Sequence, residues 1–112
     1  MRAYELMVIV KGDLDDQAAR QVVTTTEAGI AAAGGEVKRT DVWGRRRFAY
    51  EIDHRWEGFY FVIELLGPGG SALDELERTL RIADEVVRHK LIRLPDGEAA
   101  KRGLLGEASA AS

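Results

Sequence analysis

Cysteine is absent from this sequence of 112 residues, which excludes disulfides, thiolate metal sites and cysteine nucleophiles. Proline occurs only twice, and the hydrophobic (46%) and charged (31%) contents are typical of a globular chain rather than a disordered one. Long hydrophobic runs are also missing, because neither residues 6–10 nor residues 59–63 approach the ~20 residues of a membrane span. No apolar signal segment follows the first two residues. We therefore expect one cytosolic domain that makes no use of a membrane.

Residue sets for catalysis or metal binding are equally scarce. His54 and His89 are the only histidines, and no paired-histidine or Asp-rich pattern offers metal-ligand spacing. The three serines lie at an expected helix start or near the C-terminus, so a serine triad lacks a suitable nucleophile. The sequence therefore predicts a protein that is not an enzyme, with no metal, no cofactor and no small-molecule substrate.

Positive charge is concentrated in two segments, although the net charge of the chain is -3. Residues 38–47 contain five basic residues against one acid, and residues 88–93 contain three basic residues and no acid. This asymmetry is compatible with an anionic partner that contacts one side of the protein.

The hydrophobic pattern predicts four strands and two helices. Strands are expected at residues 3–11, 36–52, 59–66 and 86–94, with helices between residues 13 and 33 and at residues 72–82. In the second strand the apolar residue Val37 stands at an odd position, whereas the apolar residues from Val42 onward stand at even positions. One extra residue between them would put all of these side chains on one face, so we expect a β-bulge between Lys38 and Gly44. The order β-α-β-β-α-β is that of the ferredoxin-like split βαβ sandwich, an α+β fold. In this fold two helices cover one face of a four-stranded antiparallel sheet.

This domain is expected to span residues 1–94. The remaining residues, 95–112, are small, polar and aperiodic, and we expect them to form a flexible tail.

The sheet face without helices is expected to be unusually apolar. Met7 and Ile9 on the first strand, and Tyr60 and Val62 on the third, have the parity opposite to that of the residues expected to meet the helices. A continuous apolar face indicates a partner-binding surface. Isolated surface hydrophobic residues are also common, so both interpretations stand at this level.

The segment from Trp43 to Tyr50 is the most informative part of the chain. Its three consecutive arginines must alternate between the faces of an extended strand, which places Arg45 and Arg47 with Trp43 and places Arg46 with Phe48. Arginines beside aromatic rings suit phosphate contact and base stacking. A charged edge strand that resists aggregation is the competing interpretation.

Four segments resemble the bacterial small-subunit ribosomal protein S6 family. They are residues 1–5, the block from Trp43 to Ile52, residues 57–60 and residues 80–91. The likeness runs over residues 1–94, and its most specific part is the stretch from Gly44 to Tyr50. The family has the split βαβ fold predicted above, so the two arguments agree. Phe48 stands where the family usually has leucine, and Asp53 stands where a basic or small residue is usual.

The resemblance implies a structural component of the small ribosomal subunit, ribosome-associated in the cytoplasm. Family members pair with ribosomal protein S18 and bind the central domain of the small-subunit rRNA. The basic residues expected to contact RNA are Arg2, Arg45, Arg46, Arg47, Arg81, Arg88 and Lys90. The residues expected to stack or to contact the partner are Tyr4, Met7, Ile9, Trp43, Tyr60 and Val62.

Two alternatives from other functional classes share this fold. One is a small-molecule regulatory domain that acts as a homodimer, which the triple arginine disfavours. The other is an acylphosphatase-like enzyme, which needs an anion-binding loop after the first strand. Here residues 11–16 carry three acids, which would repel a phosphate.

Overall fold

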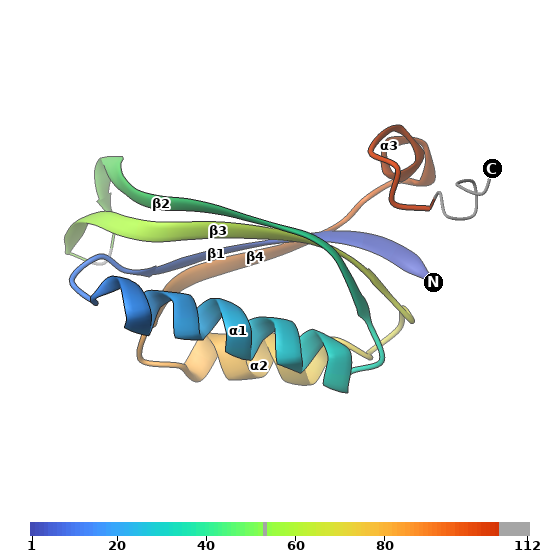
Figure 1. The fold of residues 1–112 in the computed structure, drawn as a ribbon, viewed down its shortest axis with the longest axis horizontal. Coiled ribbons are helices and arrows are strands. Elements are labelled where there is room, and N and C mark those ends of the chain that lie inside the picture. The colour runs from blue at the N-terminus through green and yellow to red at the C-terminus, as the bar shows by residue number, and fades with distance from the viewer. Residues whose placement is uncertain (53, 106–112) are drawn as a thin grey trace.

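The computed structural model describes residues 1–52 and 54–105, which form seven elements. In chain order these are β1 (Arg2–Lys11), α1 (Asp16–Ala32), β2 (Glu36–Ile52), β3 (Arg55–Gly67), α2 (Asp74–Ile82), β4 (Val86–Arg93) and α3 (Asp96–Lys101). The strands form one antiparallel sheet in the order β2-β3-β1-β4, and α1 and α2 lie beneath the same face (Figure 1). This arrangement confirms the predicted ferredoxin-like fold. None of the helices in the described ranges is long and apolar enough to cross a membrane.

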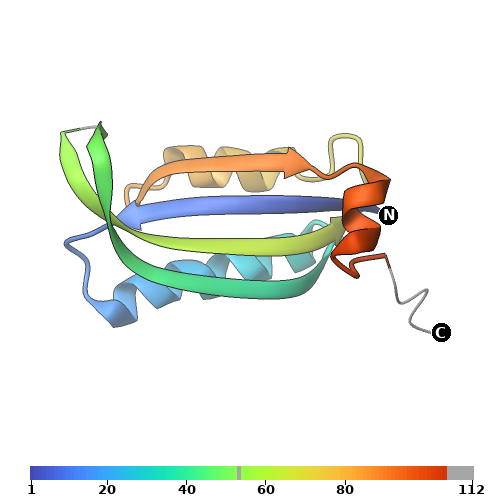
Figure 2. The ribbon, with the colours of Figure 1, turned by 90° about the horizontal axis from the view of Figure 1, so that it is seen from above.

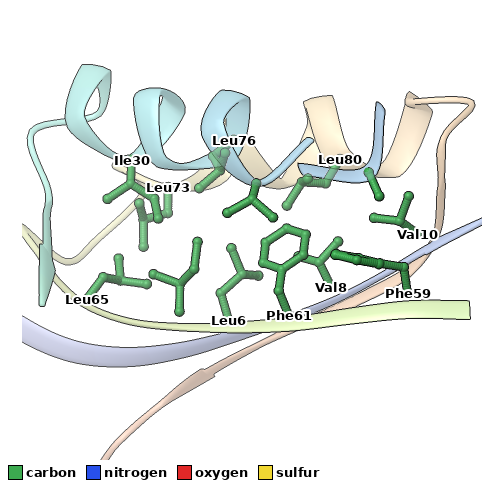
Figure 3. Packing of buried hydrophobic residues seen from close by; sticks show 13 residues of the cluster. Leu6, Val8, Val10, Ile30, Phe59, Phe61, Leu65, Leu73, Leu76 and Leu80 are labelled. Atoms are coloured by element: carbon green, nitrogen blue, oxygen red, sulfur yellow. The ribbon is translucent and has the colours of Figure 1, made fainter. Parts of the chain in front are cut away.

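The main core lies between the sheet and the two long helices. Every second residue of β1, from Leu6 to Val10, points to the helices, as does every second residue of β3, from Phe59 to Leu65. These side chains pack against Ile30 of α1 and the leucine stripe of α2 (Figure 3). Burial of this continuous apolar layer fixes which face of the sheet the helices cover, and leaves the other face open.

Two bulges interrupt β2. The register against β3 shifts between Val37 and Arg39 and again between Val42 and Gly44, which confirms a bulge in the predicted segment and adds a second one. Gly44 has a φ of +83°, a conformation that L side chains rarely adopt and that glycine adopts readily. The second bulge changes which face each side chain of the arginine block occupies.

The end of the β2–β3 hairpin bends away from the helices (Figure 1). Between Arg47 and Ile52 the register shifts again, because four residues of β2 stand opposite Trp56 alone on β3. Phe48 lies on the open face at this bend, where it packs with Ile9 and Ile52 in a second small core. Ile9 is therefore only 3% exposed, so the expectation that it lies free for a partner is wrong.

The segment after Pro95 differs from the expected tail. Residues 96–101 form α3, which lies across one end of the open face (Figure 2). Ala99 and Leu104 are buried in a third small core with Ala3 and Leu94. A helix of six residues is too short to produce a clear hydrophobic period, so only its contacts with the sheet reveal it. Residues 106–112 of the expected tail lie outside the described residues.

Candidate nucleic-acid and partner interface

We call the open face of the sheet, opposite α1 and α2, the trough, and its apolar floor consists of Met7, Tyr60 and Val62. The hairpin end rises at one end of the trough and α3 lies across the other (Figures 1 and 2). Met7 of β1 pairs with Val62 of β3, and both side chains are partly exposed on this face, as expected from the sequence. Tyr60 lies two residues before Val62 on β3. The Trp43 ring stacks on the Tyr60 ring, with the ring centroids 5.9 Å apart and an angle of 10° between the ring planes. Four of the predicted contact residues therefore share one surface.

The second bulge puts Trp43 and Arg45 on opposite faces of the sheet. The sequence interpretation placed Trp43 with Arg45, but Arg45 pairs with Phe59 and reaches the helix side, whereas Trp43 stacks over Tyr60. The Trp43 indole donates a hydrogen bond from Nε1 to Asp41 at 3.1 Å and remains 44% exposed. A hollow of about 620 Å³ beside it is lined by Asp41, Val42, Trp43, Arg46 and Tyr60. The ring is held in place and is still available to a partner.

Exposed basic side chains flank the apolar floor on both edge strands. Arg46 lines the hollow on β2, and on β4 Lys90 pairs with Met7 while Arg88 pairs with Ile9. These three basic side chains have no ion pair within 4.0 Å among the residues that the structure describes. Positive charge without an internal counterion, on both margins of one face, suits an anionic ligand.

Arg45 serves the fold instead. Its Nε donates to the Gly12 carbonyl at 3.0 Å, and its guanidinium also bonds the Leu14 carbonyl and the Asp16 carboxylate. The hydrogen bond from Arg45 lowers the pKa of the Asp16 carboxyl. Arg45 thus ties the β1–α1 loop to β2, and its donors are engaged with its own chain.

Three other predicted residues lie away from the open face. Tyr4 is on the helix side of β1 and packs against the main core. Arg81 is exposed near the end of α2, in the helix layer. Arg2 is exposed at the start of β1, where its side chain lies against Gly69. The fold therefore does not bring these three residues to the trough.

Arg102, which the sequence analysis did not single out, controls the charge at the α3 end of the trough. Its Nη1 donates to Glu5 at 2.7 Å and to Glu64 at 3.0 Å, and its Nε donates to Glu98 at 2.8 Å. These hydrogen bonds, led by that of Glu5, raise the pKa of Arg102. Arg39 also binds Glu64, with Nε at 2.7 Å from Oε1. The two arginines neutralise carboxylates that would otherwise make this end of the open face acidic. Residues from four elements, β1, β2, β3 and α3, meet here, so no local sequence pattern reveals the cluster.

Metal-binding geometry is missing from the described ranges. They contain no group of three or more His, Cys, Asp or Glu residues that could hold a metal ion. His89 of β4 lies on the helix side, where its Nε2 is 3.3 Å from the Glu77 carboxylate.

Comparisons with known proteins agree with this architecture. The family model described as Ribosomal protein S6 matches residues 3–93. Small ribosomal subunit protein bS6 of Salinispora arenicola is 48% identical over 93 residues, which are 83% of this chain and 96% of that protein. The protein of the same name from Carboxydothermus hydrogenoformans is 43% identical with the same coverage. The crystal structure of 30S ribosomal protein S6 from Thermotoga maritima matches with a TM-score of 0.83 and 31% identity, over 90% of this chain and 94% of that one. The chain therefore belongs to the ribosomal protein S6 family and is a structural, non-enzymatic protein of the small ribosomal subunit.

Proposed function

We propose that this protein binds the central domain of the small-subunit rRNA as a heterodimer with ribosomal protein S18. The apolar floor of the trough receives S18, and the free basic residues along its margins contact RNA phosphates. The observation that carries this proposal is the combination on one face of Met7, Val62, Trp43 and Tyr60 with exposed basic side chains on both edge strands.

The floor suits a protein partner because its aromatic residues are already ordered. The Trp43 ring is fixed by its stack on Tyr60 and by its hydrogen bond to Asp41. Burial of such a ring in an interface costs little side-chain entropy, and exposed tryptophans with this geometry are typical interface hot spots. We expect Trp43→Ala to weaken S18 binding by about 2 kcal/mol.

The basic margins position the RNA rather than read its sequence. Arg46, Arg88 and Lys90 are free to neutralise phosphates, and release of counterions then makes affinity fall steeply with salt. The net charge of -3 opposes RNA binding by the chain alone. We therefore expect tight RNA binding only from the heterodimer.

A salt-titrated gel shift with an rRNA central-domain fragment tests the proposal. This protein alone, S18 alone and the two together are compared. The proposal requires a shift that appears with both proteins and fades as salt rises. Equal affinity with and without S18, or no shift from the folded pair, would overturn it. Sedimentation would then show whether the chain forms the homodimer expected of a regulatory domain.

Charge variants distinguish a direct phosphate contact from the effect of a change in the net charge of the protein. Arg88→Ala and Lys90→Ala remove charge at the trough, and each is expected to reduce the salt slope by about 1. Arg78→Ala is the matched control, because Arg78 is exposed on α2 in the opposite layer and pairs with Glu75 at 3.2 Å. Equal effects of the three variants would mean that the trough margins do not contact RNA.

A further inference from the structure

We propose that the end of the β2–β3 hairpin is a separate RNA-binding element that takes an unpaired nucleotide. The base stacks on Trp56 and its phosphate meets Arg47. The inference rests on the proposed RNA-binding function and adds a second contact region to it. Of these two residues only Arg47 belongs to the set predicted from the sequence.

Trp56 is exposed although the structure around it is well packed. Phe48 and Ile52, on the strand opposite, are 5% and 9% exposed and pack with Ile9 on the sheet. Because they fill the inward positions of the bend, the neighbouring rings turn outward: Trp56 is 50% exposed and Tyr50 is 66% exposed. The hairpin end thus carries two exposed large aromatic side chains on a segment that is anchored by this packing.

The charge next to Trp56 favours a nucleic acid over a purely apolar partner. The Arg47 guanidinium lies over the Trp56 ring with its Cζ 6.0 Å from the ring centroid. Glu57 stands opposite Arg47 in the strand register, yet within the described residues Arg47 makes no ion pair. An arginine held against an indole gives a planar cationic surface, on which a base stacks while the guanidinium bonds a phosphate.

The same geometry favours an unpaired nucleotide over a duplex. In an A-form duplex the base faces are buried by their neighbours, so an exposed ring can stack only on a base that is free of the helix. Arg46, which lines the hollow of the trough, is the neighbour of Arg47 in the chain, so the two contact regions adjoin on β2.

The test uses the fact that the chain has only two tryptophans. This protein is labelled with fluorotryptophan and S18 is not. Fluorine NMR then follows Trp43 and Trp56 separately, and the variants Trp43→Phe and Trp56→Phe assign the two resonances. In the complex with unlabelled S18, addition of the rRNA fragment is expected to shift the Trp56 resonance. S18 alone is expected to leave it unchanged. A shift caused by S18 alone would overturn the RNA assignment and make the tip a protein contact.

Affinity measurements complete the test. Trp56→Ala is expected to weaken RNA binding by the heterodimer about 5- to 100-fold, and Trp56→Phe by less, because a ring remains. Arg47→Lys keeps the charge but loses the planar group, and it is expected to weaken binding as well. The matched control is Ile82→Ala, which removes a 67% exposed apolar side chain from the helix layer. Unchanged affinity of a folded Trp56→Ala heterodimer would overturn the inference and leave the proposed function intact.

A second measurement does not depend on the heterodimer. The labelled chain alone is titrated at low salt with a short single-stranded RNA and with an RNA duplex. A shift of Trp56 with the single strand only supports the inference, even if the wild-type heterodimer fails to bind the rRNA fragment. No shift with either RNA, together with an unmoved resonance in the heterodimer, overturns it.

Discussion

Arg102→Met should release α3 from the sheet while leaving the rest of the fold in place. The Arg102 guanidinium supplies two hydrogen bonds between α3 and the sheet, to Glu5 at 2.7 Å and to Glu64 at 3.0 Å. Methionine keeps most of the aliphatic side chain, so the change removes mainly the charge. The Arg102 side chain is 28% exposed and that of Glu64 is 12% exposed. The strength of the two bonds should therefore lie between that of a surface ion pair and that of a buried charged hydrogen bond. We assign about 1 kcal/mol to each, or about 2 kcal/mol for the docking of α3.

Native-state hydrogen exchange measures this quantity directly. The amides of Arg102 and Leu104 donate to the carbonyls of Glu98 and Ala99, so they exchange when α3 opens. A loss of about 2 kcal/mol should raise their exchange rates roughly 30-fold, since each 1.4 kcal/mol is a factor of ten. Amides of β1 and β3 should keep their rates.

The control is Lys101→Met on the exposed side of the same helix. The reasoning is refuted if the Leu104 amide exchanges at the same rate in Arg102→Met as in the wild type. In that case Ala99 and Leu104 alone would hold α3 against the sheet.

Two further predictions concern the hairpin and the loop before α1. Phe48→Ala should lower the free energy of unfolding by about 3 kcal/mol, because it leaves a cavity over Ile9. Urea denaturation measures this loss, Phe48→Leu should cost much less, and equal stability of the alanine variant would show that the hairpin bend does not depend on this packing. The Asp16 pKa is lowered by Arg45, so the stability that this pair contributes is complete above the unfolded-state pKa of about 4 and is lost as pH falls through the lower folded-state value. Arg45→Met should therefore shift the urea midpoint more at pH 7 than at about pH 2, and the same shift at both pH values would mean that the ion pair does not stabilise the fold.

Hydrophobic periodicity determined the four strands, the two longer helices and the sheet, because these follow from short-range patterns. Alternation along β1 and β3 assigned Leu6 and Phe61 to the helix side and Met7 and Val62 to the open side, and the structure confirms this. The parity change in β2 located a bulge correctly for the same reason. The prediction that Arg45 shares a face with Trp43 failed because a second bulge reverses the alternation after Val42, and periodicity does not reveal a bulge that falls within a polar stretch.

The sequence by itself therefore determined the fold, the apolar character of the open face and the positive charge at its margins. Tertiary structure alone decided which of these residues are available to a partner. Arg45 bonds the β1–α1 loop, Ile9 is covered by Phe48, and α3 is held to the sheet through Arg102. These contacts join residues that are far apart in the chain, and their free energies depend on distance and burial, which a linear pattern does not contain.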